Sequence, residues 1–259
     1  MAWLVLAYLG SLAVLLLSAF WTTDAFTGAV IHTFTFDNIT RVATDPVFRA
    51  ATIRTVAVAL AVTLICAVLA VPLAFYMAKV ASSRIRLVLV VAVTTPLWAS
   101  YLVKAYAWRM LFAPDGPLAW VSGHRPGYGL TATIVTLSYL WLPYMVIPVF
   151  AAFHRVPASL LDASSDLGAS DFSTLRMVVA PLLFPGIAAG SIFTFSLSLG
   201  DYIAVTIVGG KTQLLGNIIY GQLVTANNQP LAAALSIIPL LAIVAYLLAM
   251  RRTGALENV

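Results

Sequence analysis

Residues 161–181 read LDASSDLGASDFSTLRMVVAP, a polar stretch that decides how the rest of the chain folds. The runs that flank it, 126–153 and 177–200, carry no charged residue. An apolar run of about 20 residues is long enough to span a bilayer as a helix. The stretch therefore predicts a compact polar element that joins two membrane-spanning helices and stands clear of the lipid. Its charged residues are Asp162, Asp166, Asp171 and Arg176.

The composition of the whole chain also indicates a membrane protein. Of its 259 residues, 62% are hydrophobic and 9% are charged, with a mean hydropathy of +1.00. Soluble domains carry roughly 25% charged residues. Because the apolar surface needs lipid as its solvent, we expect an all-α membrane protein with one transmembrane domain over residues 1–259.

The net charge of +5 and the single cysteine narrow the possible functions. The positive charge is spread thinly, which suits loops near anionic lipid better than a nucleic-acid surface. Cys66 lies in an apolar run and cannot form an intrachain disulfide or a cysteine metal cluster. We expect it to be a small packed side chain, and the three histidines show no metal-ligand spacing.

Six apolar runs predict six membrane-spanning helices. The first has no Lys or Arg before its apolar part and is too long for a signal-peptide core, so we interpret it as a retained helix. The last follows the polar segment GQLVTANNQP, which we expect on the outer surface. The six runs are Ala2 to Trp21, Thr55 to Ala78, Leu87 to Ala113, Pro126 to Phe153, Met177 to Gly200 and about Leu231 to Met250.

The distribution of Lys and Arg predicts the orientation of these helices, since cytoplasmic loops carry more of them. With both termini in the cytoplasm, the inside segments 79–86, 154–180 and 251–259 hold seven basic residues. The longer outside segments, 22–54, 114–128 and 209–230, hold five. The stretch at 161–181 then faces the cytoplasm.

Local signals predict two short helices in the polar stretch. Pro157 suits a first helical turn, and Gly168 can end the first helix in the left-handed conformation. Ser170 can cap the second helix, whose positive N-terminal end suits Asp171. The predicted product is a helix–turn–helix hairpin over about 156–181. On physical grounds alone, an ordinary loop with good capping would show the same features.

The hairpin resembles the EAA loop of bacterial ABC-importer permeases. In that family an acidic residue, two small residues, a glycine and a terminal proline recur, and Asp replaces the usual Glu here. Ser replaces the second Ala, and Ala180 stands where Leu is usual. The resemblance implies that the hairpin docks on a cytoplasmic ATPase through Asp162, Ala163, Ser164, Gly168 and Pro181.

Nearly the whole chain is similar to spermidine/putrescine-type permeases. The similar segments are TTPLWASYLVKAYAWRML (94–111), PGIAAGSIFTFSLSLGDYIAVTIVGG (185–210) and LLGNIIYGQLVTANNQPLAAALS (214–236). The resemblance implies the type I importer permease fold and a place in the inner membrane of a bacterial cell. It also implies three partners, namely an ABC ATPase dimer that binds ATP and Mg, a second permease subunit that is a paralogue, and an extracytoplasmic solute-binding protein. No Walker A pattern is present, so we expect no cofactor in this chain and no enzymatic activity.

Asp201 is a carboxylate at membrane depth, since it separates the apolar runs 182–200 and 202–208. Placing it there costs at least ~2.5 kcal/mol, so it should face a pore or a partner charge. In the resembled family the Gly-Asp-Tyr of the fifth span lies on the translocation route, which implies the same for Gly200, Asp201 and Tyr202. A carboxylate beside aromatic rings suits an ammonium ion. The alternative is that Asp201 neutralises Lys104 or Arg109.

The third run supplies further candidates for the route. Trp98 and Tyr101 can line it together with Asp201 and Tyr202, or they can be packing residues or interface anchors. Thr95 and Pro96 predict a kink in this helix.

The sequence therefore favours the permease subunit of an ATP-driven importer for polyamines, small cationic solutes. Another small solute is the alternative, whether amino-acid-like, an anion or iron. A secondary transporter would need intramembrane ion sites and usually internal repeats, and an intramembrane enzyme would need clustered catalytic residues. Only the importer explains the hairpin.

Overall fold

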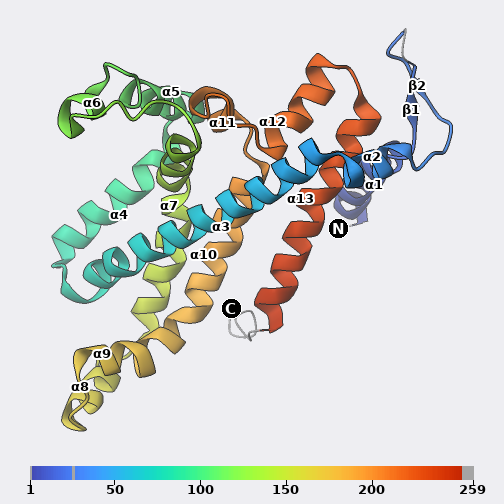
Figure 1. Ribbon diagram of the computed structural model, residues 1–259. Coiled ribbons are helices and arrows are strands. Elements are labelled where there is room, and N and C mark those ends of the chain that lie inside the picture. The colour runs from blue at the N-terminus through green and yellow to red at the C-terminus, as the bar shows by residue number, and fades with distance from the viewer. Residues whose placement is uncertain (1, 25–26, 253–259) are drawn as a thin grey trace.

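A computed structural model describes residues 2–24 and 27–252 of the chain, and its centre is a bundle of three long helices (Figure 1). These are α3, Pro46–Phe75, α7, Leu130–Arg155, and α10, Ala180–Gly200. A π-helical turn, η1 at Tyr76–Val80, extends α3 at its C-terminal end, and another, η2 at Leu175–Val179, extends α10 at its N-terminal end. The predicted all-α membrane fold is confirmed.

Small residues allow α3 to approach α7 closely. Cys66, Ala70 and Ala74 recur every four residues on α3 and are fully buried in the main core. The Cys66 Sγ donates to the Ser138 carbonyl of α7 at 3.4 Å. Because lipid tails are as apolar as the helices, packing contact rather than hydrophobic transfer drives association, and small residues favour it. The prediction that Cys66 is a packed side chain is confirmed.

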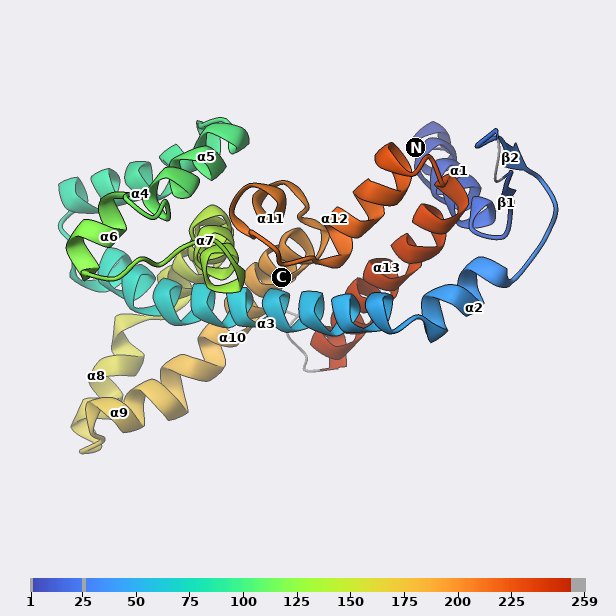
Figure 2. The ribbon, with the colours of Figure 1, turned by 45° about the horizontal axis from the view of Figure 1, so that its top comes forward.

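The remaining helices flank this bundle on two sides (Figures 1 and 2). On one side are α4, Ser83–Trp98, α5, Tyr101–Leu111, and α6, Pro117–Ser122. On the other are α1, Ala2–Ser18, α2, Asp37–Thr44, and α13, Gln229–Arg252, with a small antiparallel pairing of β1, Thr22–Thr23, and β2, Val30–Ile31. The short elements are α8, Ala158–Asp166, α9, Asp171–Thr174, α11, Ile203–Val208, α12, Leu215–Tyr220, and the π-helical turn η3, Gly221–Thr225.

Four of the six predicted spans are continuous helices long and apolar enough to cross a membrane. They cover Pro46–Val80, Leu130–Arg155, Leu175–Gly200 and Gln229–Arg251. The first predicted span is the shorter helix α1, which ends at Ser18 instead of Trp21. The second span begins nine residues before the predicted Thr55, because the Asp45 carboxylate accepts from the Val47 N–H at 2.8 Å and Pro46 occupies the first turn.

The third predicted span is not one helix, and this corrects the prediction of a continuous run from Leu87 to Ala113. The chain bends by 100° between α4 and α5, at Ala99 and Ser100, which are both extended. The bend lies three residues beyond Pro96, where the sequence predicted a kink. The Lys104 ammonium donates to the Pro96 carbonyl at 2.7 Å, which satisfies a backbone acceptor freed by the break.

Loops from distant parts of the chain meet at the two ends of the bundle. At one end the Lys79 ammonium donates to the Val156 carbonyl at 2.7 Å, so η1 lies beside the segment that leads to α8. At the other end the Arg54 guanidinium donates to the Gln213 carbonyl at 3.1 Å. The Gly129 N–H donates to the Val208 carbonyl at 3.0 Å at that same end. The segments 79–86 and 154–180 thus share one end.

Two glycines set the contact between α7 and α10. A Cβ on Gly186 would lie 2.6 Å from the Ala152 Cβ and 2.8 Å from the Pro148 carbonyl oxygen. A Cβ on Gly190 would lie 2.6 Å from the Met145 Sδ. The Gly186 neighbours belong to a backbone and a short side chain, which cannot move away as a flexible side chain can.

We predict that Gly186→Ala destabilises the bundle by about 1–3 kcal/mol, because it overpacks the contact between α7 and α10. Thermal unfolding of the purified protein should show a lower Tm. Gly221→Ala is the matched control, since a Cβ there would meet nothing within 4 Å. Equal Tm values for the two variants would contradict the role of Gly186.

Candidate functional site

The polar stretch forms a helical hairpin that projects from one end of the bundle (Figure 2). The first helix, α8, ends at Asp166, and Gly168 then adopts φ +73°, the left-handed conformation. The Ala169 N–H donates to the Ser164 carbonyl at 3.1 Å and closes the turn. The Ser173 N–H donates to the Ser170 Oγ at 3.3 Å, so Ser170 caps the second helix as predicted.

Ser164 holds the two helices of the hairpin together. Its side chain is buried, and its hydroxyl lies 2.7 Å from the Thr174 hydroxyl on α9. Ala163 is exposed, and Leu167 at the tip is 87% exposed. Asp162 lies on α8, but its side chain falls outside the described part of the structure. The hairpin therefore presents Ala163 and Leu167 outward, while Ser164 serves its internal packing.

The second half of the hairpin continues without interruption into the membrane. The backbone is helical from Asp171 through η2 into α10, and Pro181 lies in the first turn of α10. The other half follows directly from α7, whose last helical residue is Arg155. The hairpin thus joins α7 to α10, two helices that pack directly against each other in the bundle.

Asp201 lies at a second break in the helices, between α10 and α11. Its side chain is 8% exposed, and its Oδ1 accepts from the Ala204 N–H at 2.9 Å at the start of α11. The Tyr101 hydroxyl donates to its Oδ2. Tyr101 is the first residue of α5, directly after the 100° bend. One hydrogen bond therefore connects the two helix breaks.

A cavity of about 280 Å³ opens beside this hydrogen bond. Three aromatic residues line it, with the Tyr101 and Trp141 ring centroids 5.9 Å apart and the Tyr202 ring stacked on Tyr220 at 4.7 Å. The Trp141 Nε1 is buried and has no hydrogen-bond partner among the described residues. The lining residues are Tyr101, Trp141, Ser196, Leu197, Gly200, Asp201, Tyr202 and Ile203.

Neither basic residue of the third predicted span pairs with Asp201, which corrects the alternative of an ion pair. Lys104 bonds to the Pro96 carbonyl, and the Arg109 guanidinium donates to the Ile207 carbonyl at 2.9 Å. Arg109 also lies over the Tyr128 ring, 5.1 Å from its centroid. Both cations satisfy carbonyl groups at helix breaks or ends.

Three of the four predicted route residues come together, and the fourth does not. Tyr101, Asp201 and Tyr202 line the same cavity, whereas Trp98 ends α4, is 89% exposed and does not line it. Sequence reasoning missed Trp141 and Ser196. Both lie in uninterrupted apolar runs, where their pattern is that of any spanning helix, so only the three-dimensional contact identifies them.

Comparison with known proteins finds a matching family model and similar proteins of known name. The family model described as "Binding-protein-dependent transport system inner membrane component" matches residues 70–251. An Escherichia coli (strain K12) protein, the inner membrane ABC transporter permease protein YdcU, is 42% identical over 98% of this chain and 87% of its own length. The spermidine/putrescine transport system permease protein PotB of the same organism is 32% identical over 91% and 88%.

Solved structures share the fold at low sequence identity. A bacterial ABC transporter involved in the import of the acidic polysaccharide alginate has a chain with a TM-score of 0.72 and 16% identity, covering 96% of this chain and 91% of that one. A chain of the MetNI methionine ABC transporter in an inward-facing conformation has a TM-score of 0.65 and 19% identity, covering 81% and 97%. At these identities the likeness concerns the fold alone.

We predict that Tyr101→Phe lowers the stability of the fold by about 1–3 kcal/mol, because a buried carboxylate oxygen loses its donor. The Tm of the purified protein should fall. Tyr106→Phe on the same helix is the control, since Tyr106 is 54% exposed. If both phenylalanine variants unfold at the same temperature, the hydrogen bond between Tyr101 and Asp201 does not hold the two breaks together.

Proposed function

This chain belongs to the binding-protein-dependent inner-membrane permease family and is the membrane subunit of an ABC importer, and we propose that it passes polyamines, such as spermidine and putrescine. Family membership implies an ATPase and a second permease as partners. We further propose that the second permease is a paralogue and that a solute-binding protein delivers the solute from outside. ATP and Mg are then bound by the ATPase and not by this chain.

The observation that carries the proposal is the Asp201 carboxylate at the cavity lined by Tyr101, Trp141 and Tyr202. A solute with two or more ammonium groups loses much solvation energy in a membrane unless anionic or π-electron groups replace water. Asp201 supplies the negative charge, and the aromatic rings supply π faces that attract an ammonium group. The 32% identity with a permease named for spermidine and putrescine supports the same solute class.

The hydrogen bonds that the Asp201 carboxylate accepts suit a site that must release its solute. The Asp201 carboxylate already accepts from Tyr101 and from the α11 backbone, so these donors share its negative charge. A transport site must be weak enough to release what it binds. A partly neutralised carboxylate meets that requirement better than an unpaired one.

We propose that the hairpin over 156–181 faces the cytoplasm and couples the ATPase to the membrane helices. It is the element that projects from the bundle, and it joins α7 to α10 directly. The other end of the bundle, which carries Arg54, Gly129 and Lys211, then faces outward. Both termini lie in the cytoplasm in this orientation.

The function is tested with Asp201→Asn, which keeps the shape and the capping oxygen and removes the charge. Uptake of radiolabelled putrescine or spermidine by cells with the complete transporter should fall at least ten-fold, about 1.4 kcal/mol in the barrier. Basal ATPase activity and complex assembly should persist, and Asp201→Glu should be milder. Asp115→Asn is the control, because Asp115 is an exposed acid paired with Arg125 at 3.9 Å.

Normal polyamine uptake by an assembled Asp201→Asn transporter would contradict the cationic solute and favour an anion or an amino-acid-like solute. Loss of assembly would instead identify Asp201 as a structural residue. The uptake and pull-down assays separate these two outcomes.

Coupling is tested with Gly168→Val. The φ of +73° costs a β-branched residue about 1–2 kcal/mol or more, so the turn should distort and misplace α9. We expect membrane insertion to persist and solute-stimulated ATPase activity to fall several-fold. Gly168→Asn is the control, since Asn tolerates the left-handed conformation. Normal stimulation of the Val variant would remove the hairpin from the coupling mechanism.

A further inference from the structure

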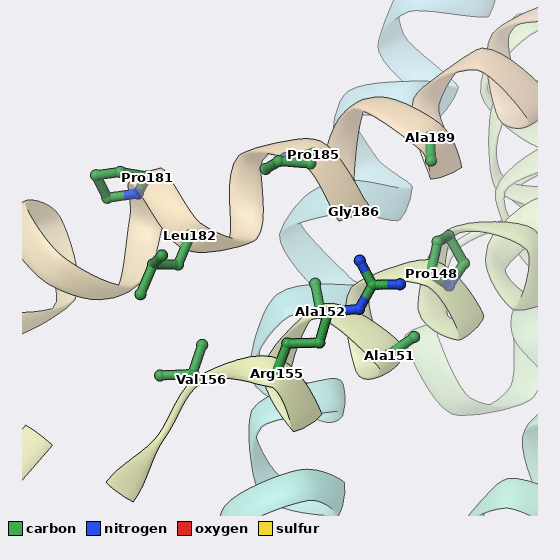
Figure 3. A pocket seen from close by; sticks show the side chains of 10 residues that line it. All are labelled: Pro148, Ala151, Ala152, Arg155, Val156, Pro181, Leu182, Pro185, Gly186 and Ala189. Carbon is green, nitrogen blue, oxygen red and sulfur yellow. The ribbon is translucent and has the colours of Figure 1, made fainter. Parts of the chain in front are cut away.

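A second cavity lies between the same two helices, at the hairpin end of the bundle (Figure 3). Its volume is about 350 Å³, and α7 and α10 form its two walls. Figure 3 shows the Arg155 side chain reaching from the last turn of α7 into the space between the helices, near Gly186. The walls are otherwise small or apolar, with three prolines, Pro148, Pro181 and Pro185.

The two cavities lie on one face of each helix. On α7 the lining residues Trp141, Pro148, Ala152 and Arg155 are separated by seven, four and three residues. On α10 the lining residues Pro185, Ala189, Ser196 and Gly200 are separated by four, seven and four. Separations of three, four and seven residues return to the same side of an α-helix. The cavities are thus the two ends of a single face formed by α7 and α10.

An aromatic pair occupies the part of this face between the cavities. Tyr144 on α7 and Phe193 on α10 complete the two series of residues, and their rings stack with centroids 6.3 Å apart and planes at 29°. Tyr144 also contacts Trp141, with centroids 6.0 Å apart. Phe193 is 56% exposed and Tyr144 is half-buried. Along both helices, the pair therefore lies between the residues that line the Asp201 cavity and those that line the Arg155 cavity.

The composition of this face differs from that of a surface in contact with lipid. On α1, which has exposed apolar side chains such as Trp3, Leu6 and Leu9, the surface is bulky and hydrocarbon-like. The α7/α10 face instead has a carboxylate at one end and a guanidinium at the other, and its cavities are also lined by small residues and by the Ser196 hydroxyl. Charged and polar groups at membrane depth favour a water-filled path over lipid.

We propose that Tyr144 and Phe193 form a gate in the translocation route, closing it between the cavity at Asp201 and the cavity at Arg155. The span from Trp141 to Arg155 is 14 residues of helix, or about 21 Å, which is most of the distance across a ~30 Å hydrocarbon core. A flat ring pair is well suited to the gate, because it blocks the path while closed and needs only a small shift of one helix to open.

The connectivity of the chain supplies the force on this gate. Tyr144 is carried by the helix that enters the hairpin, and Phe193 by the helix that leaves it. The helical backbone from Asp171 to Phe193 is a continuous lever of about 33 Å. A rotation of the hairpin therefore moves one ring relative to the other.

The gate is tested by thiol accessibility, which requires no knowledge of the solute. In a Cys66→Ala background, Ser196→Cys reports on the Asp201 cavity and Ala189→Cys on the Arg155 cavity. Ser83→Cys, at an exposed position in the segment 79–86 that shares the hairpin end of the bundle, marks the side of the membrane. The complete transporter is reconstituted in liposomes without ATP and treated with a hydrophilic, membrane-impermeant maleimide on the side that labels position 83.

With the gate intact, position 189 should react and position 196 should react slowly. Phe193→Ala should raise the labelling rate at position 196 at least ten-fold. The control is Phe184→Ala, which removes a 39% exposed ring from the opposite face of α10. Phe193→Leu, which keeps an apolar side chain and removes the ring, replaces Phe193→Ala if that variant fails to assemble.

An unchanged labelling rate at position 196 in both Phe193 variants would overturn the gate. Reaction of position 189 with a lipid-soluble maleimide alone would overturn the route, because that face would then lie in lipid. The inference rests on the chain being an importer permease and not on its solute, so failure of polyamine uptake would leave these labelling results unaffected.

Discussion

The hydrogen bond from the Tyr101 hydroxyl to the Asp201 carboxylate is the interaction on which the arrangement of this bundle depends. It joins two places where the chain stops being helical at membrane depth, the bend before α5 and the break before α11. A broken helix in lipid leaves backbone groups without partners, and each costs several kcal/mol unless the protein satisfies it. Asp201 caps α11 through the Ala204 N–H, while Lys104 satisfies the Pro96 carbonyl and Arg109 the Ile207 carbonyl. The few charged residues of the membrane region thus satisfy the backbone groups that the helix breaks leave without partners. The breaks in turn expose polar backbone and side-chain groups, which a solute crossing the membrane needs along its route.

Local chemistry explains why much of the fold could be predicted. Gly168 and Ser170 act within a few residues of their own position, so the sequence shows both the turn and the cap. Length and hydropathy likewise predict α3, α7, α10 and α13, because lipid admits little else than long apolar helices. The 100° bend at Ala99 and Ser100 was missed because its location depends on a contact that Lys104 makes with the preceding turn. Proline alone predicts a kink near residue 96, but not a full break three residues later.

At the candidate site, likewise, single residues could be identified from the sequence, but contacts between residues far apart in the chain could not. Charge and depth identified Asp201 from the sequence, yet the side-chain partners considered for it were Lys104 and Arg109, and its hydrogen-bond donor is the phenol of Tyr101. No spacing rule connects residues a hundred positions apart. Trp141 and the pair of Tyr144 and Phe193 were equally hidden, since an aromatic residue in an apolar run has the pattern of ordinary packing. Trp98 illustrates the opposite error, because its position near Tyr101 in the sequence does not place its side chain in the same cavity once the bend intervenes.

Close packing without Cβ atoms explains how a helix pair can be both tight and movable. Gly186 and Gly190 let α10 rest directly on Pro148 and Met145 of α7, so α10 itself contributes no side chain to the contact at these two points. Interlocked side chains would have to leave their rotamers before the helices could slide, at a cost that grows with each ridge crossed. A smooth contact lowers that barrier while keeping the helices in register. The bulky rings of Tyr144 and Phe193 follow immediately on the outer side of the smooth region, where a small displacement changes their overlap most. The hairpin, the glycine contact and the ring pair therefore follow one another along α7 and α10, so a movement of the hairpin reaches the rings through the glycine contact. The capped helix breaks at Tyr101 and Asp201 hold the other end of the two helices in place.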